Sequence, residues 1–124
     1  MSIIHAAERP AFDLGGTLFR PKASPSCGAT ETSVWQVEIA PGTPATPHSL
    51  TREEVFVVLD GLARVSIAGE DGQAGPGDAF VVPAGAELLL VNDGPDVLRL
   101  VCCLPVGGQA RLADGTTFTP PWAE

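Results

Sequence analysis

Glycine and proline recur between short β-prone runs along the whole chain. No run keeps a helical period for three turns without one of these two residues interrupting it. The 14 glycines and 12 prolines are spread out and form no low-complexity block. Turn residues with this distribution are typical of many short strands joined by tight turns. The chain is therefore expected to be all-β, with at most a short helix before Pro10.

Six segments combine β-prone residues with flanking turn signals. They are residues 33–40, 54–59, 63–68, 79–82, 87–91 and 97–104. In the first of them, Trp35, Val37 and Ile39 alternate with polar residues and so share one face. The run Val55–Leu59 is apolar on both faces, as expected of a strand that is covered on both sides. These features favour a jelly-roll barrel or a sandwich.

Length and charge limit the function. A chain of 124 residues suits one domain, and its net charge of −8 repels phosphate backbones and anionic lipid heads. Binding to nucleic acid or to a membrane surface is therefore not expected. The opening residues carry no signal-peptide pattern, and the three cysteines include no C-x-x-C pair. We expect reduced thiols and a cytoplasmic protein.

Two longer segments carry a more specific signal. Residues 42–61 fit the pattern G-x5-H-x-H-x3-E-x6-G except at its second histidine, and residues 77–92 fit G-x5-P-x-G-x2-H-x3-N except at its histidine. In both their patterns and their order, these segments resemble the two motifs of the cupins. The resemblance implies an antiparallel jelly-roll β-barrel.

The resemblance also implies a domain organisation. One cupin domain would span residues 1–124, and three parts are expected within it: an N-terminal arm with edge strands at 1–32, the barrel core at 33–104, and a C-terminal arm at 105–124. Trp122 follows two prolines in the last part. It needs an apolar surface to cover it, from its own barrel or from a second subunit.

Cupins that bind a metal place three histidines and one glutamate around a divalent ion. The resemblance puts His48 and Glu54 at two of these four positions, whereas Leu50 and Leu88 occupy the other two. Loss of a mere outer partner of a metal ligand typically lowers metal affinity about 10–100-fold, and loss of two direct ligands should lower it further. No metal cofactor is therefore expected. A divalent ion held by His48 and Glu54 is the weaker alternative.

Side chains outside the motifs offer further donors for such a site. The donors available for this are Cys102, Cys103, His5, Gln36 and Glu38. No spacing rule places any of them in the lumen.

The expected function is binding of a small, largely apolar molecule in the barrel lumen, since such sites combine an apolar lining with a few polar groups. Nine residues are expected to line this pocket: His48, Leu50, Glu54, Phe56, Val58, Phe80, Leu88, Leu90 and Gln36. His48 and Glu54 are the polar anchors. A direct or water-bridged contact between them is expected.

Two alternatives stay open. The first is a cupin enzyme of the isomerase, lyase or oxygenase type, in which His48 and Glu54 act as an acid–base pair or as a partial metal site. The second is a structural or interaction barrel whose lumen is filled by its own side chains. Fold alone does not choose among these functions.

A homodimer is also expected. Val55, Val57 and Leu59 leave an apolar face opposite the lumen, and one small barrel cannot easily cover both faces of that strand.

Overall fold

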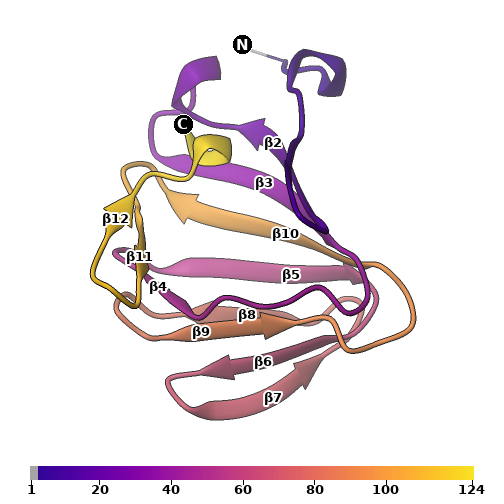
Figure 1. Ribbon diagram of the computed structural model, residues 1–124. Coiled ribbons are helices and arrows are strands. Elements are labelled where there is room, and N and C mark those ends of the chain that lie inside the picture. Colours follow the sequence, from indigo (N-terminus) through magenta and orange to yellow (C-terminus); the bar gives the residue numbers. More distant parts are fainter. Residues whose placement is uncertain (1–2) are drawn as a thin grey trace.

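The chain folds into two facing antiparallel sheets of six strands each (Figure 1). The structure is a computed structural model that describes residues 3–124. In spatial order, sheet A contains β1 (Phe12–Leu14), β2 (Thr17–Ala23), β3 (Thr32–Ile39), β10 (Leu98–Pro105), β5 (Glu54–Asp60) and β8 (Ala79–Val82). Sheet B contains β12 (Thr117–Phe118), β11 (Ala110–Leu112), β4 (His48–Leu50), β9 (Leu88–Val91), β6 (Ala63–Ile67) and β7 (Glu70–Ala74). The predicted jelly roll is confirmed, although hydrogen bonds do not close the two sheets into one barrel.

All six predicted strands are present, and each begins and ends within about one residue of its expected position. Helical structure in residues 3–124 is limited to three short 3₁₀ turns: η1 (Ala6–Glu8), η2 (Pro25–Cys27) and η3 (Pro121–Ala123). No helix in this part of the chain is long and apolar enough to cross a membrane. The segment expected to be a C-terminal arm adds β11 and β12 to sheet B.

Alternating side chains of sheet A form one wall of the interior. Trp35, Val37 and Ile39 are all buried, as their spacing predicts. Register places Cys102 of β10 between Trp35 of β3 and Phe56 of β5, so the three side chains form one inward row. This row is the surface on which the lumen is built.

Two motif residues hold the fold at the turns. Gly61 adopts φ +87°, a backbone conformation that favours glycine. A Cβ at this position would lie 2.8 Å from the Val97 carbonyl oxygen, so any other residue would require the backbone at the start of β10 to move. Asn92 is fully buried, and its side-chain amide donates to the carbonyl oxygens of Ile39 and Asp96, both at 2.8 Å. Because buried polar groups are costly when unpaired, this amide fixes the end of β9 to β3.

The end of the chain packs back onto its own barrel. The ring of Trp122 stacks on Phe19 with a centroid distance of 3.6 Å, and Phe12 meets it edge-on at 6.2 Å. The Ser33 hydroxyl donates to the Ala123 carbonyl oxygen at 2.9 Å, and Figure 1 shows η3 beside β2 and β3. Trp122 is thus covered by its own chain.

The outer face of sheet A is apolar near β5. Val55 is in register with Val81 on β8 and with Cys103 on β10, and Val57 is in register with Val101. These side chains point away from the lumen and are half-buried or exposed.

A row of charges with alternating sign crosses the same face, from Arg20 on β2 through Glu38 and Arg99 to Asp60 on β5. The N–O distances along it are 3.1, 3.9 and 3.8 Å. A two-fold axis parallel to the strands would reverse this row in a second copy and place opposite charges against each other. The face is therefore suited to a second copy of this chain.

The homodimer stays a prediction. We expect sedimentation velocity to give a dimer at micromolar concentration. Val57→Glu should convert it to a monomer, because the substitution puts a charge into the apolar part of the face. Leu62→Glu, at an exposed position in the turn after β5, is the matched control and should stay dimeric. A monomeric parent protein, or a dimer unaffected by Val57→Glu, would contradict this account.

Candidate functional site

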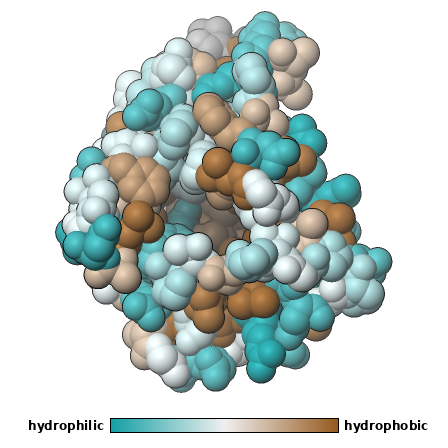
Figure 2. All heavy atoms as spheres, in the orientation of Figure 1, coloured by the Kyte–Doolittle hydropathy of each residue, from teal (hydrophilic) through white to brown (hydrophobic). Residues whose placement is uncertain are grey.

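A cavity of about 480 Å³ lies between the two sheets. Its walls come from β3, β5 and β10 of sheet A and from β4, β9 and β11 of sheet B. Figure 2 shows the hollow from outside, with hydrophobic side chains around and within it. The lumen is therefore neither filled by side chains nor sealed.

Aromatic rings make up much of the cavity wall. Trp35 and Phe56 line the sheet A side, and the stacked pair Phe19 and Trp122 lines the end near the C-terminus. Phe80 lies behind Phe56 and stacks on it with a centroid distance of 4.7 Å. Flat apolar surfaces of this kind favour flat apolar ligands.

Glu54 brings a carboxyl group into this apolar wall. It is the first residue of β5, its side chain lines the cavity, and only 3% of the residue is exposed. Loss of hydration on burial raises the pKa of Glu54 from 4.5 to about 8. The carboxyl is therefore a neutral acid at pH 7 and can donate a hydrogen bond.

The raised pKa links stability to pH. Because the folded chain holds the Glu54 proton more tightly than the unfolded chain does, this proton stabilises the fold fully below pH 4.5. The contribution is lost as pH rises through about 8. It amounts to a few kcal/mol, on the order of one kcal/mol for each pKa unit.

Cys102 lies next to Glu54 on the same wall and is completely buried. Burial raises the pKa of its thiol well above the usual range, and the charge of Glu54, when present, raises it further. Cys102 is thus a protonated, unreactive thiol at neutral pH. It acts as a small apolar wall residue.

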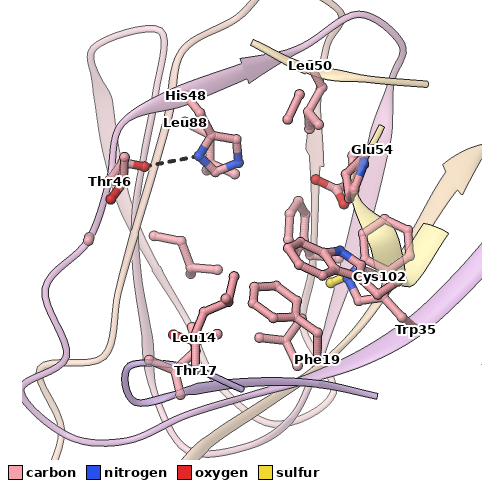
Figure 3. A pocket seen from close by; sticks show the side chains of 18 of the residues that line it. Leu14, Thr17, Phe19, Trp35, Thr46, His48, Leu50, Glu54, Leu88 and Cys102 are labelled. Carbon is pink, nitrogen blue, oxygen red and sulfur yellow. Dashed lines mark hydrogen bonds between the residues drawn. The ribbon is translucent and has the colours of Figure 1, made fainter. Parts of the chain in front are cut away.

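His48 lies on the opposite wall, at the start of β4 and directly paired with Leu88 of β9. Its Nδ1 is 3.0 Å from the Thr46 carbonyl oxygen. A carbonyl oxygen only accepts, so Nδ1 carries the hydrogen, and in the neutral ring Nε2 has the free lone pair. Figure 3 shows this second nitrogen on the side of the ring away from Thr46, with the ring and the Glu54 carboxyl turned into the cavity from opposite sides.

No direct hydrogen bond joins His48 to Glu54. The imidazole bonds instead to the Thr46 carbonyl oxygen, two residues before it, so the direct form of the expected contact is absent and the water-bridged form stays a prediction. The two side chains face one cavity as separate polar groups.

The structure brings six of the nine expected lining residues to the cavity. They are His48, Leu50, Glu54, Phe56, Leu88 and Leu90. Three do not line it. Val58 is wholly buried in the core and does not line the cavity. Phe80 lies on the sheet-edge strand β8, where it pairs with Phe56 and stacks on its ring. Gln36 lies on the outer face of β3, because its neighbours Trp35 and Val37 point inward.

Part of the cavity wall comes from outside the predicted barrel core. Leu14, Phe19, Leu112, Phe118 and Trp122 all line it. Their short strands lie outside the two motifs, so the motif pattern does not reveal them. The one available signal is Trp122, a large apolar residue near the end of the chain that needs a surface to cover it.

The residues present do not fit a cupin metal centre. Leu50 and Leu88 are both buried at the positions where histidines would stand, and neither can coordinate an ion. His5 is exposed, and Glu38 and Cys103 lie on outer faces, so none of them completes a set. No group of three or more metal-ligating side chains occurs within residues 3–124.

The fold and the lumen define a small jelly-roll protein with a pocket between its two sheets. The family model for the cupin domain matches residues 35–104, more than half of the chain, and the protein belongs to the cupin family. A search of curated proteins finds no match.

Several solved structures share the fold. The polyketide cyclase RemF from Streptomyces resistomycificus is 22% identical, with a TM-score of 0.77 over 91% of this chain and 85% of that one. KdgF from Halomonas sp. is 26% identical, with a TM-score of 0.71 over 85% and 94%. An RmlC-like cupin from Shewanella frigidimarina is 18% identical, with a TM-score of 0.72 over 85% and 90%. At this level of identity the comparisons establish the cupin fold.

Histidines placed at positions 50 and 88 test whether these two positions correspond to the metal-ligand positions of the cupins. We expect the double variant Leu50→His/Leu88→His to bind Ni²⁺ at least about 100-fold more tightly than the parent, because it regains two direct ligands beside His48. Calorimetric titration of Ni²⁺ into both proteins measures this difference. The single variant Leu90→His, from the same wall, is the control and should gain little. Equal affinity of parent and double variant would contradict the assignment of these positions.

Proposed function

We propose that this cupin binds a small, largely apolar molecule in its lumen without a metal centre. The cavity of about 480 Å³ carries the proposal, since ligand pockets typically measure roughly 300–1,000 Å³. Its lining is mainly aliphatic and aromatic, with His48 and Glu54 as the principal ionisable groups. Apolar surface gives such a site affinity, and the few polar groups orient the ligand.

The volume and access of the cavity argue against a purely structural barrel. A filled lumen would leave no space at the centre, because protein interiors pack about as densely as organic crystals. Here the Glu54 carboxyl is buried without a protein partner, at a cost in stability that an interior serving only the fold would avoid.

A second candidate function is acid–base catalysis on the bound molecule. One observation favours it: Glu54 has a pKa near 8, so it can both give and take a proton near neutral pH. In this candidate function the protein is an isomerase or lyase that uses Glu54 and His48 without a metal. The three free cysteines are in keeping with a cytoplasmic location for either function.

A fluorescent apolar probe tests the binding function. We expect N-phenyl-1-naphthylamine, a neutral aromatic amine, to bind with a marked rise in fluorescence, because it transfers aromatic surface from water to the lumen. Leu112→Trp places a large ring in the wall opposite sheet A and should weaken binding at least about tenfold. Leu62→Trp adds the same ring at an exposed position and should leave binding unchanged.

Two results would contradict the proposal. One is the absence of any fluorescence change with the parent protein. The other is equal loss of binding in both tryptophan variants, since that would place the probe on the surface instead of in the lumen.

A further inference from the structure

Two buried side chains on the sheet A wall carry a nitrogen or oxygen atom without a protein partner. No fully buried side-chain nitrogen or oxygen in residues 3–124 lacks a hydrogen-bond partner. The Glu54 carboxyl and the indole N–H of Trp35 bond to no other protein group, and each residue is only 3% exposed. Their polar atoms therefore reach the cavity that both residues line. Figure 3 shows the two side chains on the same side of that cavity.

These two groups make sheet A the donor wall. The indole N–H can only donate, and a neutral carboxyl has one O–H to donate.

The sheet B wall has the opposite polarity. The bond from His48 Nδ1 to the Thr46 carbonyl places a hydrogen on Nδ1, so in the neutral ring the Nε2 lone pair is an acceptor. The lining residues near His48 on this wall are apolar: Leu50, Leu88, Leu90, Ala110 and Leu112. Among the cavity-lining residues of β4, β9 and β11, His48 is therefore the side-chain acceptor.

We infer that the ligand is a neutral, flat molecule with a carbonyl oxygen that accepts from Glu54 and Trp35, and a hydroxyl group that donates to His48. Hydroxylated aryl ketones have this chemistry. The inference rests on the proposed binding function and adds the polarity of the ligand to it. Ions are disfavoured, because an apolar cavity whose acid is neutral provides no opposite charge for them.

Three probes that share the naphthalene ring test the two walls independently. They are naphthalene itself, 2-acetylnaphthalene as the ketone, and 2-naphthol as the hydroxyl donor. We expect each polar probe to bind about 3–10-fold more tightly than naphthalene, the gain of a net hydrogen bond. Calorimetry or competition with the fluorescent amine measures the affinities. The ketone's gain should fall in Glu54→Leu, where only the Trp35 N–H still donates to it, and should be unchanged in His48→Leu. The naphthol's gain should do the reverse.

A pH series on the ketone gives a second readout. In the parent protein the affinity of the ketone relative to naphthalene should fall as pH rises through about 8, because ionised Glu54 no longer donates a hydrogen bond. Glu54→Gln keeps an N–H donor that does not titrate, so its affinity for the ketone should stay constant. The titratable groups that line the cavity with Glu54 are His48 on β4 and Cys102 on β10. His48→Leu should retain the pH effect of the parent, and Cys102→Ala should retain it as well.

The outcomes separate the two proposals. If naphthalene binds but both polar probes bind with the same affinity as naphthalene in every variant, the proposed polarity of the ligand is wrong and the binding function stands. If Glu54→Leu weakens ketone and naphthol alike, the naphthol hydroxyl donates to the Glu54 carbonyl oxygen instead of to His48, and the assignment of the two walls is wrong. If no probe binds the parent protein, the binding function itself fails.

Discussion

The burial of the Glu54 carboxyl in an apolar wall is the interaction on which the character of the lumen depends. Loss of hydration, without a cation or donor to offset it, keeps the group neutral and raises its pKa to about 8. A carboxylate paired with a metal ion would have the opposite shift. Leu50 and Leu88 are buried at two positions of the cupin ligand set, and they line a largely apolar cavity with one acid and one facing imidazole.

The two cupin motifs divide physically into residues that hold the fold and residues that bind the ion. Gly61 and Asn92 belong to the first kind, through a close approach to Val97 and a buried amide that joins two strands. Both are retained. Of the second kind, only His48 and Glu54 remain. The residues that hold the fold are thus present in this chain, whereas two of the four positions for metal ligands are leucine.

Sequence patterns predicted the fold well because the motifs extend over its central strands and each strand has clear alternation. They missed β7, where Glu70, Asp71 and Gly72 have the composition of a turn yet pair along β6. They also missed short edge strands such as β11, which are too brief to show a period. In the site, motif positions located His48 and Glu54. The wall around Phe19 and Trp122 depends on contacts between distant chain segments, which no local pattern encodes.

The most direct test of this account is the pKa of Glu54. In protein labelled with ¹³C at the glutamate carboxyl carbons, NMR titration follows each side chain, and Glu54→Gln identifies the signal that belongs to Glu54. The account predicts that this signal titrates near pH 8, well above the other glutamates. A midpoint near 4.5 would mean that the carboxyl is hydrated or paired with a positive charge, and would contradict the account of a neutral, apolar lumen.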